Sequence, residues 1–179
     1  GNAILNEDMT AVLKPGHEGL GWWAQTGFIP LGYFDDKKKT KSTFVTVEGT
    51  RYSVPGDRVR LLEDGLLELH GRESVTINSG GEKIFAEEVE QALKHHPGVY
   101  DVVVTSRPSE RWGQEVVAVI QLREGIDVSE DSLLEECGRH ISRYKYPKVF
   151  IYRDQIVRSS SGKADYRWAA SQIEQEEPD

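Results

Sequence analysis

The stretch that most constrains the fold is residues 71–90, because it changes from a β-type to an α-type pattern within a few positions. A β-branched run at residues 75–77 is followed by Gly80 and Gly81, and the chain becomes acidic and helix-forming from Ala86. β-Branched side chains favour strands, whereas acidic residues in a first helical turn interact favourably with the helix dipole. The pattern predicts a strand, a loop and a helix in that order.

The predicted loop contains Ser79, Gly80 and Gly81. Two adjacent glycines let a backbone approach a ligand closely, since neither residue carries a Cβ atom. A purely geometric role in a strand–turn–helix connection explains the same residues, and short glycine motifs match by chance in many proteins. The pattern alone leaves both interpretations open.

The composition is that of a soluble globular protein. Of the 179 residues, 37% are hydrophobic and 29% are charged, which is enough for one ordinary domain or two small ones. The formal net charge of −8 argues against general binding to nucleic acid or to an anionic membrane. No apolar run is long enough to span a bilayer. The single cysteine, Cys137, excludes an intramolecular disulfide and fits a cytoplasmic protein, in which we expect it to be structural.

The histidines and the basic run predict no metal site and no nucleic-acid site. His95 and His96 are adjacent, so on a helix their side chains point about 100° apart and cannot share a metal ion. The basic residues 37–41 are not interleaved with aromatic residues, which favours a solvated loop or the start of a helix.

The first part of the chain has a β-type pattern. Residues 1–32 are rich in glycine, and the breakers in residues 18–27 predict an irregular segment. Turn signals then separate four β-rich segments, which predicts two hairpins: residues 43–47 with 51–54, and 58–62 with 66–69. Residues 43–70 are therefore expected to form a small antiparallel subdomain, described as a partial barrel.

The second part has an α+β pattern, and we expect a compact domain with a short sheet flanked by helices. The predicted helices are residues 86–96, 129–141 and 164–174, and the predicted strands are 99–105, 116–122 and 148–152. The change of pattern predicts two domains, 1–72 and 73–179, in an α+β chain.

Three polar residues stand out as candidates for chemistry. Asp57 lies in a predicted turn, where a carboxylate can present both oxygens to a pair of hydroxyls. The planar guanidinium of Arg72 suits hydroxyls or phosphates. Lys163 ends a serine- and glycine-rich loop, from which an ammonium can stabilise charge during acyl or phosphoryl transfer. Taken singly, each residue fits an ordinary surface role at least as well.

In their order along the chain, these residues belong to five motifs that resemble those of the AMP-forming acyl-CoA synthetases. The motifs are Gly32-Tyr33 with Lys39-Thr40, Tyr52 with Pro55-Gly56-Asp57, Gly71-Arg72 with Gly80-Gly81-Glu82-Lys83, Arg111-Trp112-Gly113-Gln114, and Ser161-Gly162-Lys163. The resemblance covers nearly the whole chain, and its second half is most similar to bacterial fatty-acyl-CoA synthetases.

The resemblance implies two half-reactions. A fatty acid first reacts with ATP, assisted by Mg²⁺, to give an acyl-adenylate, and coenzyme A then displaces AMP. It implies that Asp57 holds the ribose hydroxyls with help from Arg72, and that Lys163 neutralises charge in adenylation. It also implies a hinge at Ser74 and a loop, residues 79–81, that faces coenzyme A after the small domain rotates.

Two residues depart from the family pattern. Ser74 stands where family members usually carry Asp or Lys, which puts the torsional bias of the hinge in doubt. Pro55 replaces the Thr of a Thr-Gly-Asp motif, which stiffens the turn and leaves Asp57 usable.

The family's phosphate loop and its aromatic-Gly-x-Thr-Glu segment, which would also contribute most of the Mg²⁺ site, do not occur in this sequence. We therefore expect a fragment without ligase activity of its own. Residues 1–72 would be the end of a large adenylating domain, and residues 73–179 would be the small mobile domain. The missing part of the large domain is then the expected partner of this chain. Two alternatives stay open, an enzyme that loads a carrier protein and a non-catalytic binding module. Peripheral membrane contact and the oligomeric state also stay open.

Overall fold

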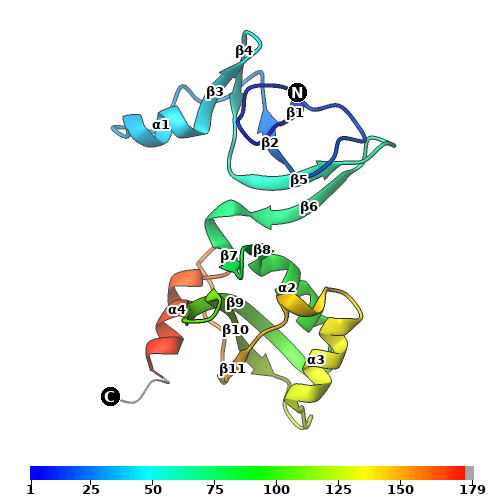
Figure 1. The fold of residues 1–179 in the computed structure, drawn as a ribbon. Helices are drawn as coiled ribbons and strands as arrows, with labels where there is room; N and C mark the ends of the chain where they lie inside the picture. The colour runs from blue at the N-terminus through cyan, green and yellow to red at the C-terminus, as the bar shows by residue number, and fades with distance from the viewer. Residues whose placement is uncertain (176–179) are drawn as a thin grey trace. The chain divides into compact units, whose positions relative to one another are not determined.

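The computed structural model describes residues 1–175, and the chain divides into two compact units, Gly1–Ser74 and Val75–Asp179 (Figure 1). The units are called unit 1 and unit 2 below. Each unit has its own β-sheet and its own buried core. The expected α+β fold is confirmed.

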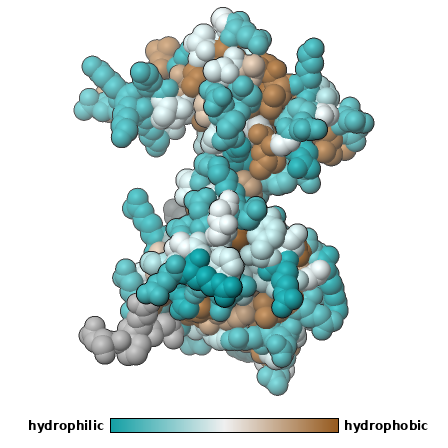
Figure 2. Space-filling view, viewed as in Figure 1, coloured by the Kyte–Doolittle hydropathy of each residue, from teal (hydrophilic) through white to brown (hydrophobic). Residues whose placement is uncertain are grey.

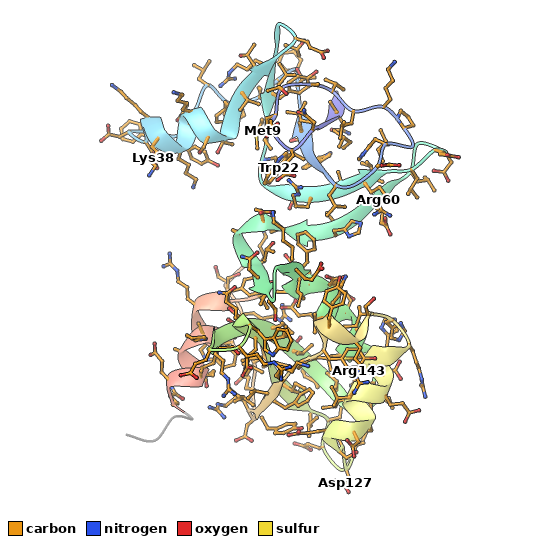
Figure 3. The ribbon with its side chains drawn as sticks, viewed as in Figure 1. Met9, Trp22, Lys38, Arg60, Asp127 and Arg143 are labelled. Atoms are coloured by element: carbon orange, nitrogen blue, oxygen red, sulfur yellow. The ribbon has the colours of Figure 1, made fainter. Side chains whose placement is uncertain are left out.

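Unit 1 is built on an antiparallel sheet of six strands with the order β3-β4-β2-β5-β6, in which β1 also pairs with β2. The path begins at β3 and ends at β6, so within the described residues the sheet is open and forms no closed barrel. A short helix, α1 (Lys37–Thr43), precedes the β3–β4 hairpin, and Lys38 projects from it in Figure 3. The strands are Asn2–Leu5, Gly21–Gln25, Phe44–Val47, Thr50–Ser53, Asp57–Leu61 and Leu67–Arg72.

The expectation of an irregular N-terminal segment is wrong, because β1 and β2 pair there in register from Asn2↔Gln25 to Leu5↔Trp22. Gly21 does not break this strand. A Cβ atom at Gly21 would lie 2.7 Å from the carbonyl oxygen of Leu5, so the glycine allows the strands to approach closely. Trp22 and Met9 pack against the unit 1 core (Figure 3).

Unit 2 contains a five-stranded sheet in which β10 is central. It pairs with β9 over ten positions in an antiparallel register and with β11 in a parallel one, and β7 joins it through Gly113↔Ser79. The strands are β7 (Thr76–Ser79), β8 (Glu82–Phe85), β9 (Val99–Ser109), β10 (Gly113–Leu122) and β11 (Val149–Tyr152). The helices are α2 (Ala86–Lys94), α3 (Glu130–Gly138) and α4 (Tyr166–Glu174), and a short 3₁₀ turn is formed by Arg143–Lys145. A second 3₁₀ turn, Glu73–Val75, contains the last residues of unit 1 and the first of unit 2.

Helices cover both faces of this sheet, as Figure 1 shows. Val102 and Val104 pack into one core with residues of α2 and α3, whereas Val103 packs into a second core that includes Ala169 of α4. Successive residues of a strand point to opposite faces, so a strand buried on both sides needs an unbroken apolar run. The runs in β9 and β10 meet that requirement.

Local signals placed the helix starts well. Ser129 accepts a hydrogen bond from the backbone of Ser132 and caps α3, as its position before two acidic residues predicts. At α2, the Glu88 side chain accepts a hydrogen bond from the backbone N–H of Phe85. The helices end earlier than expected, at Lys94 and Gly138, and α4 begins at Tyr166.

Candidate functional site

Asp57 and Arg72, fifteen positions apart, meet in unit 1 because the β5–β6 pairing places them directly opposite each other. Arg72 Nε donates to Asp57 Oδ1 over 3.0 Å. The Asp57 side chain is 17% exposed and that of Arg72 is 51% exposed. Asp57 is the first residue of β5 and not a turn residue, so its carboxylate is held on a strand by an oriented cation.

Arg58 is a residue that the sequence reasoning missed. Its side chain is 5% exposed, and it forms a salt bridge with Glu7 and approaches Glu73 to 3.8 Å. Its guanidinium also lies 4.1 Å from the centre of the Trp22 ring. An arginine is buried only at a large desolvation cost unless it is paired, so this cluster ties the end of β6 to β2. The alternation of β5 gave no signal for it, because Arg58 and its neighbour Val59 are both buried where the β5–β6 register shifts.

Residues 79–81, interpreted from the sequence as the loop before a helix, form the tip of a β7–β8 hairpin. Ser79 pairs with Glu82, and between them Gly80 has φ +61° and Gly81 has φ +88°. A two-residue hairpin turn with two positive φ angles matches the strand twist, and glycine adopts it without strain. The Gly80 N–H donates to the Trp112 carbonyl oxygen over 2.9 Å, which ties the tip to the turn before β10.

The two tip glycines differ in what a side chain would meet, which gives a matched pair of variants. A Cβ atom on Gly80 would lie 2.9 Å from Trp112 Cε3, whereas one on Gly81 would meet nothing within 4 Å. Gly81→Ala is expected to lower the free energy of unfolding by about 1 kcal/mol through its positive φ. Gly80→Ala is expected to lower it by about 1 kcal/mol more, because the ring must shift.

Urea unfolding followed by circular dichroism measures both effects. In a Trp112→Ala background, the Gly80→Ala and Gly81→Ala variants are expected to lose equal stability, since the ring that caused the difference is gone. Equal losses already in the wild-type background would contradict this account of Gly80.

Lys163 is exposed in a turn that closes on itself. Its N–H donates to Ser159 Oγ over 3.1 Å, and its carbonyl oxygen accepts from the Ser159 N–H over 2.9 Å. Gly162, at φ +77°, donates to the Ser159 carbonyl oxygen over 2.8 Å. The backbone of Lys163 is therefore held in place while its ammonium extends into solvent.

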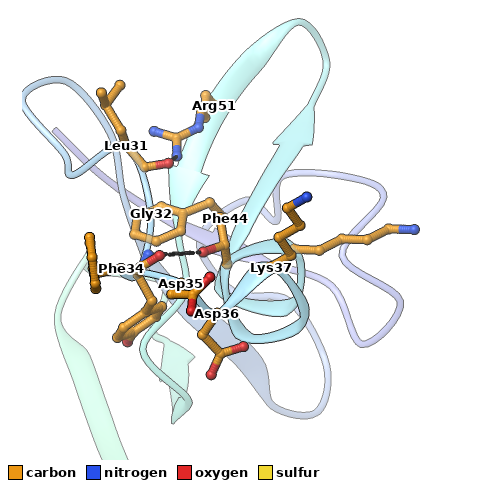
Figure 4. A pocket seen from close by; sticks show the side chains of 11 residues that line it. Leu31, Gly32, Phe34, Asp35, Asp36, Lys37, Phe44 and Arg51 are labelled. Atoms are coloured by element: carbon orange, nitrogen blue, oxygen red, sulfur yellow. Dashed lines mark hydrogen bonds between the residues drawn. The ribbon is translucent and has the colours of Figure 1, made fainter.

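The Gly-Tyr…Lys-Thr segment surrounds an open hollow of about 870 Å³ in unit 1 (Figure 4). Thr40 Oγ1 accepts a hydrogen bond from the Tyr33 N–H over 2.8 Å, and a Cβ atom on Gly32 would collide with the Thr40 side chain at 2.6 Å. Arg51 donates to the carbonyl oxygens of Pro30 and Leu31. These contacts explain the segment as a local structural motif.

The surface of unit 1 also carries exposed apolar side chains, and Figure 2 shows apolar residues among polar ones. Phe28, Leu31 and Phe34 are almost fully exposed. In residues 1–175, no helix is both long enough and apolar enough to span a membrane.

Cys137 is buried, and burial raises the pKa of its thiol to about 11. A thiol in that state is not a nucleophile at neutral pH, in agreement with a structural role.

Across residues 1–175, no cluster of His, Cys, Asp and Glu side chains could hold a metal ion. His95 stacks on His140, with 4.0 Å between ring centres.

Comparison with known proteins assigns the chain to a family. Residues 88–163 match the family model of the AMP-binding enzyme C-terminal domain. Over 94% of its length, the chain is 58% identical to the medium-chain acyl-CoA ligase Mig of Mycobacterium avium, of which it covers 31%. Residues 88–163 belong to the AMP-binding enzyme C-terminal domain family. The expected family is confirmed.

Two further comparisons agree with this family assignment. The chain is 48% identical to a 3-oxocholest-4-en-26-oate–CoA ligase of Rhodococcus rhodochrous, over 94% of the chain and 30% of that relative. It superposes with a TM-score of 0.81 and 28% identity on o-succinylbenzoate CoA synthetase of Bacillus subtilis in complex with the acyl-adenylate intermediate OSB-AMP, over 94% of the chain and 33% of that structure. The chain spans about a third of the length of these relatives.

The motif residues are divided between the two units. Unit 1 contains the paired Asp57 and Arg72 and ends at Ser74. Unit 2 carries the hairpin tip at residues 79–81 and the closed turn with Lys163, on separate elements.

Proposed function

We propose that this chain is the C-terminal part of an AMP-forming ligase that activates a fatty acid with ATP and transfers the acyl group to coenzyme A. The observation that carries the proposal is the 58% identity to a medium-chain acyl-CoA ligase over 94% of the chain, a span that includes all five motifs. The names of the relatives, all CoA ligases, favour coenzyme A over a carrier protein as the acceptor.

In the proposed first half-reaction, a carboxylate oxygen of the fatty acid attacks the α-phosphorus of ATP. The bond to the bridging oxygen breaks, and pyrophosphate leaves with the electron pair. The Lys163 ammonium binds the carboxylate and phosphate oxygens and stabilises the charge that develops there. Asp57 accepts hydrogen bonds from the two ribose hydroxyls, and its hydrogen-bonded ion pair with Arg72 orients the carboxylate.

In the proposed second half-reaction, the thiolate of coenzyme A attacks the acyl carbonyl carbon, and AMP leaves from the tetrahedral intermediate. Unit 1 is the end of the large adenylating domain, and unit 2 is the small mobile domain, which rotates about Ser74 between the half-reactions. The division of the chain between Ser74 and Val75 supports this pivot. After rotation the hairpin tip, with Gly81 open to its surroundings, faces the coenzyme A chain.

Magnesium bound to ATP would neutralise phosphate charge in this reaction. Within residues 1–175 no group of three or more His, Cys, Asp or Glu side chains could hold a metal ion, and we propose that the Mg²⁺ is bound mainly by the large domain of the full-length ligase. The acidic net charge fits a protein that binds no nucleic acid, and we propose a cytoplasmic location, with peripheral contact to a membrane as a source of fatty acid.

Acyl-CoA formation tests the proposal. The full-length ligase, supplied with ATP, Mg²⁺, coenzyme A and a medium- or long-chain fatty acid, is expected to form the thioester, detected by mass spectrometry. The 179-residue chain alone is expected to form none. Product from the chain alone would overturn the fragment assignment. Acyl transfer to a phosphopantetheinyl carrier protein and not to coenzyme A would overturn the proposed acceptor.

A further inference from the structure

The turn that carries Lys163 is attached to the sheet of unit 2 by an ion pair that has no role in the half-reactions proposed above. Arg158 lies at the base of the turn and bridges to Ala164 on its other side. The Arg158 guanidinium forms a two-pronged ion pair with Asp101 of β9, with Nε at 2.6 Å from Oδ2 and Nη2 at 2.5 Å from Oδ1. Such a pair constrains both position and orientation, because two parallel hydrogen bonds must be satisfied together.

The same guanidinium also contacts the turn itself. Arg158 Nη1 donates to the carbonyl oxygen of Gly162, the residue before Lys163, over 3.3 Å. One side chain therefore links the central sheet to the position next to the proposed catalytic lysine. The internal hydrogen bonds of Ser159 with Lys163 give the turn its shape, and Arg158 joins that shape to the sheet.

The Asp101 side chain is itself held in place by neighbouring groups. Its Oδ1 accepts from the Val102 N–H over 2.9 Å, and Lys94 Nζ lies 3.2 Å from the same oxygen. Burial alone would raise the pKa of Asp101, but hydrogen bonds from Arg158 and Val102 outweigh burial and hold that pKa below its ordinary value. The side chains of Asp101 and Arg158 are 15% and 27% exposed, so solvent screens the pair only partly.

We propose that Arg158, oriented by Asp101, is a positioning residue that sets the Lys163 turn for the adenylation half-reaction. The inference rests on the proposed role of Lys163. An ammonium stabilises a transition state only when it is already in place, and small displacements of a positioned group cause large losses of rate. Loosening the turn therefore slows adenylation and leaves the thioester step, which uses the hairpin tip, unchanged.

The half-reactions of the full-length ligase test this inference. Arg158→Gln is expected to reduce kcat for adenylation at least tenfold, measured by pyrophosphate release, with thioester formation from synthetic acyl-adenylate within about twofold of wild type. Arg158→Lys keeps the positive charge but loses the two parallel hydrogen bonds of the guanidinium. Its adenylation rate is expected to lie between those of Arg158→Gln and the wild type. Arg107→Gln is the matched control: Arg107 forms an ion pair with Glu115 at 2.6 Å between β9 and β10, and its loss is expected to affect neither step.

The mobility of the turn supplies a readout that does not depend on activity. A nitroxide label on Ser160→Cys of the 179-residue chain reports the turn, because Ser160 is exposed and the only natural cysteine, Cys137, is buried and unreactive. Arg158→Gln and Asp101→Asn are expected to narrow the spectrum of the label, and Arg107→Gln is expected to leave it unchanged. Melting temperatures within a few degrees of wild type identify the folded variants.

The outcomes separate the inference from the function on which it rests. Equal losses in both half-reactions, or an unchanged label spectrum, would overturn the positioning role of Arg158. If Lys163→Ala abolishes adenylation while Arg158→Gln does not slow it, the proposed function stands and only the inference fails. If Lys163→Ala leaves adenylation intact, the assigned role of Lys163 fails first.

Discussion

Lys163→Ala in the full-length ligase is expected to slow acyl-adenylate formation by about 10²–10³-fold, the loss typical of removing one group that stabilises transition-state charge. The thioester step from preformed acyl-adenylate is expected to stay within about twofold, because we propose that this step uses residues 79–81 in place of Lys163. The substitution is not expected to disturb the fold, since the side chain of Lys163 is exposed and the hydrogen bonds of the turn are made by its backbone.

Pyrophosphate release measures the first step, and thioester formation from synthetic acyl-adenylate measures the second. Lys148→Ala is the control, because Lys148 is an exposed lysine of the same unit that belongs to none of the five motifs. Equal losses in both half-reactions would rule out the assigned role for Lys163.

Glu90→Gln is expected to remove a pH dependence from the stability of unit 2. Glu90 is only 6% exposed, and its Oε1 accepts from the Val104 N–H over 2.9 Å. Burial raises the pKa of Glu90 from 4.5 to about 7, and the charge of Glu87 adds to this, whereas the Val104 hydrogen bond and the charges of Lys94 and Arg158 oppose it.

The sign follows from the raised pKa. Between pH 4.5 and about 7 the folded state binds the proton more tightly than the unfolded state, so stability decreases as pH rises through that window. The shift corresponds to about 3 kcal/mol between the two ends. The neutral amide of Glu90→Gln does not titrate, so its stability relative to wild type is expected to increase from pH 4.5 to pH 8.

Urea unfolding of the 179-residue chain at several pH values measures this difference. Glu124→Gln is the control, because Glu124 is an exposed glutamate in the turn after β10, and its stability is expected to follow that of the wild type. A constant difference between Glu90→Gln and wild type across the window would show that Glu90 does not titrate there.

The sequence predicted most elements because their signals are local. The cap at Ser129, the apolar runs of β9 and β10 and the hairpins of unit 1 each depend on neighbours within a few residues. The errors share the opposite cause. Strand β8 has four residues and runs directly into α2, so its pattern merges with that of the helix, and only its pairing with β7 defines it. Gly21 was interpreted as a breaker because its reason, the carbonyl oxygen of Leu5, comes from another strand.

The sequence by itself determined the α+β class, the change of pattern near residue 72, and the family resemblance that comparison with known proteins confirmed. Tertiary structure alone decided how those residues are held. The Asp57–Arg72 pair depends on the register of β5 and β6, and the Arg158–Asp101 pair joins residues 57 positions apart. Residue types and hydrophobic periodicities can be recognised within a few neighbouring positions of the sequence. Ion-pair partners and buried charges depend on packing between distant segments, and no local pattern encodes that packing.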